Sequence, residues 1–330
     1  MANVFLKPTV IAATGIGLLY RELTIARTVW TDAINPGEFS GALNDTVNMR
    51  IPARRTARKR TLRAGTAIVN DASNEFSVPV QLTTDVYNGA PITDEELTLD
   101  ISDFGVQILN PQIIAVAEGV EDEIADEIEG ASYPAGMTLN PDWTEFKVSG
   151  KTDWYLVAAR AAKLLDDNHV PTTGRTLLVG SGVKEEIVTD DRFTRADSIG
   201  DAAAVDTLRE RTLGRIAEFN VVYSPSIDED AAYAYHRTAF VLATRAPLVP
   251  RGASAGIVRS AGSVANAGGA SSYYDGLSIR WLSDYDYTNT TDRSLVNTWV
   301  GTATLLDVDT PSNPASTKSL KRAVKIINGS

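Results

Sequence analysis

The sequence predicts a mixed α+β fold in which a long β-hairpin and a long helix precede a compact α/β region. Apolar and polar residues alternate over 46–51 and 76–83, the pattern of half-buried strands. Apolar residues then recur at spacings of three and four from Ile113 to Ile128, which indicates one buried helix face. Between 140 and 250, short apolar runs alternate with helical patterns, as α/β units do.

Composition narrows the class of protein. The 330 residues are 43% hydrophobic and 22% charged, as in ordinary globular chains. The absence of cysteine excludes disulfides, thiolate nucleophiles and zinc–sulfur sites, and fits synthesis in a reducing cytoplasm. The apolar stretch 10–19 is broken by Thr14 and two glycines, so we expect no signal peptide. No apolar run reaches the length of about 20 residues that spans a bilayer, so we expect no membrane partner.

Charge is distributed in two opposed blocks, although the formal net charge is -11. The stretch between the two hairpin strands is basic, and the predicted helix is rich in carboxylates. The basic residues are Arg50, Arg54, Arg55, Arg58, Lys59, Arg60 and Arg63. The acidic residues are Glu118, Glu121, Asp122, Glu123, Asp126, Glu127 and Glu129. Opposite blocks on one chain predict that copies attract each other in a set register, with the basic loop on a neighbour's acidic helix.

Each block also has another interpretation. A basic loop can bind the phosphates of DNA or RNA, but this one has no interleaved aromatic residues for stacking and no helix–turn–helix or zinc pattern. Carboxylates can bind hard cations, but these surround a helix instead of converging, and no calcium-loop spacing accompanies them. We therefore favour a solvated or partner-facing acidic surface and predict no metal site.

The residues suited to catalysis are few. His169 lies in a polar loop before Pro171, and His236 fits a packed or edge-strand position, so neither is predicted to be catalytic or a ligand. The run Thr14–Gly17 has part of a dinucleotide fingerprint but lacks its third glycine and a preceding strand. No phosphate-binding P-loop is present. The sequence predicts a protein that is not an enzyme and needs no cofactor.

Further elements follow from capping and breaker residues. Thr93 and Glu96 form a capping box, Pro111 opens the long helix and Gly130 ends it. Thr152 is the predicted cap of a helix that buries Trp154, Val157, Ala161 and Leu164. Other predictions are an arm at 1–45 with a helix beginning near Pro8, helices from Ser181 and over 203–211, a loop at 261–272, strands near 219–222, 239–243, 277–282 and 295–305, and a linker at 310–316.

The order of these parts, together with several short motifs, resembles one known family. The motifs are Ala2-Asn3 with Phe5-Leu6-Lys7-Pro8, Ile92-Thr93-Asp94-Glu95-Glu96-Leu97, Asp103-Phe104-Gly105, Ala239-Phe240-Val241-Leu242-Ala243 with Pro247 and Pro250, and Gly276-Leu277-Ser278-Ile279-Arg280 with Asp284-Tyr285-Asp286. In sequence order they are similar to the major capsid proteins of tailed actinobacterial phages, which have the Hong Kong 97-type capsid fold. The resemblance covers essentially the whole chain.

The resemblance implies roles for the segments. It implies an N-terminal arm (1–45), an extended loop that reaches over a neighbouring subunit (46–82), a peripheral domain with a spine helix (83–139), an axial domain (140–274), and returning peripheral strands with a C-terminal tail (275–330). It also implies hexamers and pentamers of the chain in an icosahedral shell, a scaffolding protein and a portal as partners, double-stranded DNA inside without sequence-specific binding, assembly in the host bacterial cytoplasm, and a place in the virion.

Two alternatives remain open. An encapsulin-type nanocompartment shell protein shares the fold, and a specific enclosed cargo protein would favour it. A cytosolic α/β enzyme or carbohydrate-binding module would be a stable monomer whose melting temperature responds to a ligand. The sparse acid–base inventory and the long hairpin with no partner segment argue against the second alternative.

Overall fold

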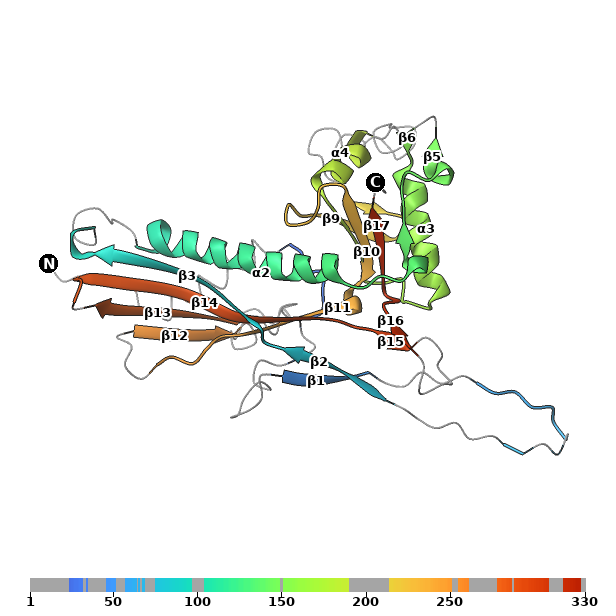
Figure 1. Ribbon diagram of the computed structural model, residues 1–330, viewed down its shortest axis with the longest axis horizontal. Helices are drawn as coiled ribbons and strands as arrows, with labels where there is room; N and C mark the ends of the chain where they lie inside the picture. Colours follow the sequence, from blue (N-terminus) through green and yellow to red (C-terminus); the bar gives the residue numbers. More distant parts are fainter. Residues whose placement is uncertain are drawn as a thin grey trace, which may run out of the picture.

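The structure is a computed structural model, which describes residues 24–31, 34, 46–51, 57–63, 65, 67–68, 75–96, 104–148, 151–189, 214–250, 255–260, 278–286, 288–308 and 317–327. Figure 1 shows an elongated body of helix on sheet, a compact α/β part at one end, and a hairpin that extends beyond both. The predicted mixed helix-and-sheet class is confirmed. The predicted helices near Pro8 and over 203–211, the loop at 261–272 and the linker at 310–316 lie outside the described residues.

The hairpin consists of β1 (Thr46–Ile51) and β2 (Phe76–Gln81). The two strands are antiparallel, with Thr46 opposite Gln81 and Ile51 opposite Phe76. This pairing places Val47 opposite Val80, so apolar side chains of both strands share one face and pack against buried residues of the body. The alternation in the sequence predicted both strands correctly.

The long helix α2 (Asn110–Gly130) has 21 residues, which gives a rod of about 31 Å. Pro111 lies in its first turn, where the missing N–H has no helical partner to lose. The predicted stripe is buried, because Ile113, Ala117, Val120, Ile124 and Ile128 are each at most 1% exposed. The predicted capping box, which precedes α2 in the chain, is also present. The Thr93 N–H donates to Glu96 Oε2 at 2.9 Å, and the Glu96 N–H donates to Thr93 Oγ1 at 3.3 Å.

Helix α2 lies along one face of a five-stranded antiparallel sheet (Figure 1). The sheet has the order β11-β14-β13-β12, and β3 pairs with the long strand β14. Its strands are β3 (Thr84–Thr93), β11 (Phe240–Arg245), β12 (Ala255–Ser260), β13 (Ser278–Asp286) and β14 (Thr291–Thr304). A polar bridge fixes helix to sheet: Ser294 Oγ donates to Gln112 Oε1 at 2.7 Å, and the Trp281 Nε1–H donates to Ser294 Oγ at 3.0 Å. Each of these buried groups therefore has a partner.

Among the described residues, the compact part consists of a six-stranded sheet and the helices α3 (Trp154–Asp167) and α4 (Ser181–Thr189). Its strands, in spatial order, are β4 (Thr138–Leu139), β17 (Ala323–Ile327), β10 (Ala231–His236), β7 (Arg175–Val179), β9 (Phe219–Tyr223) and β8 (Arg215–Ile216). Short elements complete the described chain: β5 (Lys147–Val148), β6 (Lys151–Thr152), β15 (Asp307–Val308), β16 (Lys318–Ser319), a π-helix (Gly105–Leu109), and 3-10 turns at Ala135–Met137, Thr144–Phe146 and Arg237–Ala239.

Three sequence-based details need correction. The cap of α3 is Asp153, whose Oδ1 accepts the N–H groups of Tyr155 and Leu156, and not Thr152. The buried stripe of α3 includes Leu165, whereas Leu164 is half-buried. The limits 140–274 and 275–330 do not follow the sheets, because β11 and β12 pair within the sheet of β14 while β17 pairs with β10. Alternation predicts that a segment is a strand but does not name its partner.

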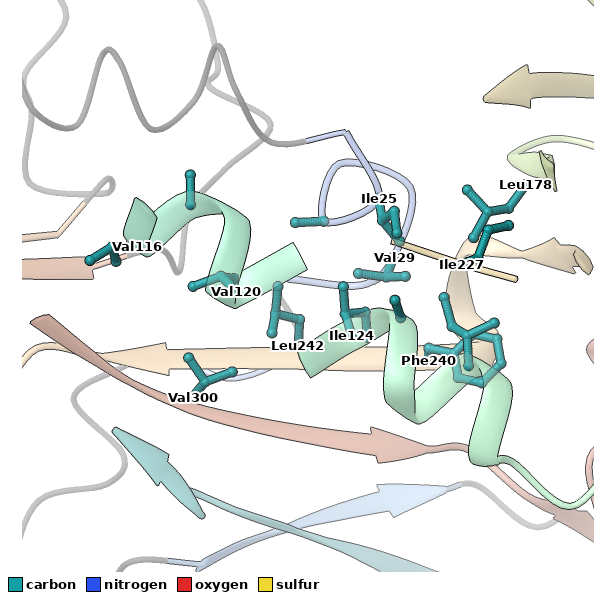
Figure 2. Packing of buried hydrophobic residues seen from close by; sticks show 14 of the residues in the cluster. Ile25, Val29, Val116, Val120, Ile124, Leu178, Ile227, Phe240, Leu242 and Val300 are labelled. Atoms are coloured by element: carbon teal, nitrogen blue, oxygen red, sulfur yellow. The ribbon is translucent and has the colours of Figure 1, made fainter. Parts of the chain in front are cut away.

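One buried cluster joins the two parts (Figure 2). Ile25 and Val29, from the segment before the hairpin, lie beside Val120 and Ile124 of α2. The same cluster continues to Phe240 of β11 and on to Leu178 of β7. Because this apolar core is continuous from the elongated body into the compact part, the two sheets are held together as one unit.

Candidate assembly surfaces

The basic loop is the first candidate surface. Its described residues 57–63 lie far from both sheets in Figure 1. Of the predicted basic residues, Arg50, Arg58, Lys59, Arg60 and Arg63 are exposed, while Arg54 and Arg55 lie outside the described residues. Two apolar side chains share this loop, Leu62 at 91% and Ile68 at 71% exposure. Large apolar side chains this exposed, on a segment away from the body, are typical of a surface that a partner covers.

The second candidate surface is the outer side of α2. Glu118, Asp122 and Asp126 are exposed and lie four residues apart, so they form one acidic stripe along the helix. We call these three residues the acidic stripe. Like charges at this spacing repel each other, so a positively charged partner would relieve a cost that the isolated chain carries.

The other four acids of the helix accept hydrogen bonds from groups of the same chain; they are Glu123, Glu127 and Glu129, and Glu121, which is described below. Glu123 accepts a hydrogen bond from Thr84 Oγ1 at 3.1 Å, and Glu127 accepts hydrogen bonds from the hydroxyls of Thr302 and Thr304. Glu129 Oε1 accepts the Asp228 N–H at 2.7 Å. These contacts orient α2 on its own sheet and on the compact part, so the acidic surface open to a partner is narrower than the sequence predicts.

Glu121 is a clear departure from the prediction. It is 6% exposed, and its carboxylate accepts the N–H groups of Thr24 at 2.7 Å, Ile25 at 2.7 Å and Ala26 at 3.1 Å, as well as the Thr24 hydroxyl at 3.0 Å. Burial raises the pKa of Glu121, and these hydrogen bonds oppose that rise. The expectation that Glu121 faces a neighbouring subunit is therefore corrected. Its spacing in the sequence is the signal that could have found this: Glu121 follows Ala117 by four residues and precedes Ile124 by three, so it lies beside the buried stripe.

The two histidines have different settings. His236 ends β10, which lies between β7 and β17, so the packed interpretation holds and the edge-strand interpretation does not. Its Nδ1 accepts the Thr238 N–H at 3.2 Å, which begins the following 3-10 turn. His169 is exposed and has a positive φ of 59°, two residues after the end of α3. The Thr14–Gly17 run lies outside the described residues.

Among the described residues, no three histidine, aspartate or glutamate side chains converge as a metal site would require. In the same part of the chain, no helix combines the length and apolar composition needed to cross a bilayer. The described residues thus present two surfaces of opposite charge, the basic loop of the hairpin and the acidic stripe of α2.

Comparison with known proteins then defines the fold. No protein-family model matches the chain, and no curated protein matches it in sequence. Solved structures do match. The capsid of Ralstonia phage GP4 aligns with a TM-score of 0.61 at 12% identity, over 93% of this chain and 91% of that chain. A structure from Mycobacterium phage Che8 aligns with a TM-score of 0.59 at 17% identity, over 92% and 90%. The capsid of cyanophage P-SCSP1u aligns with a TM-score of 0.56 at 14% identity, over 91% and 86%.

These alignments extend over nearly the whole length of both chains, so the fold is that of a viral shell protein. More specifically, the chain has the Hong Kong 97-type fold of phage coat proteins, with an extended hairpin, a long spine helix on a sheet, and a compact α/β part at one end. The fold that the resemblance in sequence implied is confirmed.

Proposed function

We propose that this chain is the major capsid protein of a tailed phage and that it assembles, through hexamers and pentamers, into an icosahedral shell around double-stranded DNA. The observation that carries the proposal is the capsid fold over more than nine-tenths of the chain, joined to a hairpin that ends away from its own body. A single subunit leaves Leu62 and Ile68 in water, whereas a neighbour in a shell would cover them.

In this proposal the basic loop docks on a neighbouring copy, with Arg58, Lys59 and Arg60 near the acidic stripe of that copy. Each exposed ion pair contributes only about 0.2–1 kcal/mol, so a single pair does not hold two subunits together. Repetition around a closed lattice sets the register, while burial of Leu62 and Ile68 adds association energy. Weak individual contacts also let a misplaced subunit leave before the shell closes.

The same proposal assigns the chain to the virion, as a structural protein without catalytic activity that is assembled in the host cytoplasm with a scaffolding protein and a portal. The net charge of -11 supports enclosure of DNA without sequence-specific binding, because a negative surface repels the phosphate backbone. The axial role of the compact part, in rings of five and six copies, belongs to this proposal as well.

The test is electron microscopy of the purified full chain together with sedimentation at low and high salt. We expect closed shells, or sheets and tubes of hexameric units, whose yield falls as salt screens the loop contacts. A chain that stays monomeric at high concentration in every salt, alone and when expressed with its neighbouring phage genes, contradicts the proposal. Shells that instead contain one specific cargo enzyme identify a nanocompartment.

The loop contact has its own test. The triple variant R58E/K59E/R60E reverses three charges, and we expect it to abolish shells at low salt. The matched control R58K/K59R/R60K keeps the charges at the same positions and is expected to assemble. If the reversed variant forms shells as readily as the control, the proposed pairing with the acidic stripe is wrong.

A further inference from the structure

The described tip of the hairpin is open to solvent along its whole length. Residues 57–61 belong to no helix or strand, residues 62–63 form a turn, and every side chain over 57–63 is exposed. The segment lies beyond both sheets, at the far end of the hairpin (Figure 1). A protease binds its substrate as an extended strand, so a segment that already lies open and away from the body binds without local unfolding.

The residues of this tip match the specificity of one class of protease. Trypsin-type serine proteases have an aspartate in the pocket that receives the side chain before the cut bond, so they cut after lysine or arginine. Arg58, Lys59 and Arg60 provide three such positions in succession. Arg63 is a poorer position, because its φ of 67° belongs to a turn and not to an extended strand.

The other lysines and arginines of the described chain are held more firmly. Outside the hairpin tip they lie in helices and strands, and the exceptions among the described residues are Arg27, Lys321 and Arg322. Each exception directly adjoins a residue that is at most 1% exposed; these neighbours are Ala26, Leu320 and Ala323. A protease that bound there would have to pull core residues into water first, which makes these bonds slower to cut.

A cut in the tip would leave both halves of the hairpin attached to the body. β1 and β2 pair over six residues each. Ile51 is 8% exposed and Val80 is 0% exposed, and both belong to a buried cluster that includes Val241 of β11 and Ala303 of β14. None of residues 57–63 belongs to a buried cluster of the described chain. The cut therefore opens the loop without removing core contacts.

We propose that residues 57–61 are a proteolytic site at which a trypsin-type serine protease cuts subunits that have not assembled. The bond after Lys59 is the central one, with exposed residues on both sides. Water adds across this peptide bond, which leaves a carboxylate on Lys59 and an ammonium group on Arg60. The nicked subunit stays folded, but its loop is in two pieces and no longer presents Arg58 and Arg60 on one continuous segment.

The discrimination between free and assembled subunits rests on the proposed capsid function. Docking of the basic loop on a neighbouring copy covers the bond after Lys59, because Arg58, Lys59 and Arg60 are the residues placed in that contact. The same three residues therefore carry assembly in the shell and cleavage outside it. Proteolysis at this site removes subunits from the pool that can assemble and spares those already in a shell.

The test is limited digestion of the full chain by trypsin, with free subunits and shells separated by sedimentation and digested in one buffer. In free subunits we expect the first cut within residues 58–60, identified from the masses of the two fragments, and a melting temperature of the nicked subunit within about 2 °C of the parent. The R58Q/K59Q/R60Q variant is expected to be cut there at least about tenfold more slowly. Lys163→Gln, at an exposed position of α3, is the matched control and is expected to be cut like the parent.

Shells are expected to be cut at least about tenfold more slowly than free subunits, and nicked subunits are expected to form no shells. The proposal is overturned if the first cut falls elsewhere in the chain, if the nicked subunit unfolds, or if shells and free subunits are cut at the same rate. A chain that forms no shells contradicts the capsid function, whereas the position of the first cut and the melting temperature still test the site itself. The two failures are therefore distinguishable.

Discussion

Glu121 Oε2 accepts the backbone N–H of Ile25 at 2.7 Å, across 96 positions of sequence. Oε1 of the same carboxylate accepts the N–H groups of Thr24 and Ala26. Three successive backbone donors thus converge on one buried carboxylate, while Ile25 and Val29 enter the apolar cluster beside it (Figure 2). This contact attaches the segment before the hairpin to the spine helix, and it makes Glu121 a structural residue of the subunit.

Replacing Glu121 is expected to destabilise the subunit. Glu121→Ala leaves three N–H groups without their acceptor, and we expect the free energy of unfolding to fall by about 2–4 kcal/mol. Glu121→Gln keeps one acceptor oxygen and is expected to lose about half as much. Chemical denaturation measures both values, and faster hydrogen exchange at the amides of residues 24–26 would locate the effect. Asp122→Asn is the exposed control and is expected to change stability by less than about 0.5 kcal/mol.

The raised pKa of Glu121 predicts a pH dependence of defined sign. The folded chain holds this proton more tightly than the unfolded chain, whose glutamate has its ordinary pKa of 4.5. The contribution of Glu121 to the free energy of unfolding therefore falls as pH rises from 4.5 through the folded-state pKa. The measurement is the stability difference between the parent and Glu121→Gln across this range. A difference that grows in favour of the parent with rising pH would contradict the assignment.

Gly301 of β14 allows the end of β2 to approach the sheet closely. A Cβ at this position would lie 2.2 Å from the Gln81 carbonyl oxygen, so the two backbones would have to separate. We expect Gly301→Ala to lower the free energy of unfolding by about 2–3 kcal/mol through this overpacking. Gly130→Ala, where a Cβ would meet nothing within 4 Å, is the control and is expected to unfold like the parent. Equal melting temperatures for the two variants would show that the backbones separate without cost.

Arg175 is a buried cation whose partners reach it from the surface. Its side chain is 0% exposed and bonds Asp166 at 2.6 Å, Glu218 at 3.2 Å, and the carbonyls of Val170 and Pro171. We expect Arg175→Leu to destabilise the compact part by about 2–4 kcal/mol, because two carbonyl groups and two carboxylates lose one shared donor. Arg175→Lys is expected to recover only part of this loss, since an ammonium cannot reproduce the planar fork of donors. Full recovery by lysine, measured by thermal unfolding, would show that charge alone matters.

Local patterns in the sequence were sufficient for a large part of the fold. Period-two alternation predicted β1 and β2, and the three–four spacing predicted the buried stripe of α2 from Ile113 to Ile128, because each pattern reflects one face of one element. The capping box of Thr93 and Glu96 was equally local, since its two partners are three residues apart. The basic loop was recognised because its charges are contiguous in sequence.

The pairing of strands that are far apart in the sequence depends on tertiary packing. The segment of β11 was predicted to be a strand, whereas the segment of β17 was placed in a C-terminal tail. In the structure β11 joins the sheet of α2 and β17 joins the six-stranded sheet, since the partner of a strand is set by which faces pack together. Glu118 and Glu121 are the same residue type on one helix, yet the backbone of residues 24–26 covers only Glu121. Local sequence patterns therefore predicted β1, β2, the buried face of α2 and the two charge blocks. Packing between segments about a hundred residues apart decided which carboxylates are buried and which remain for a partner.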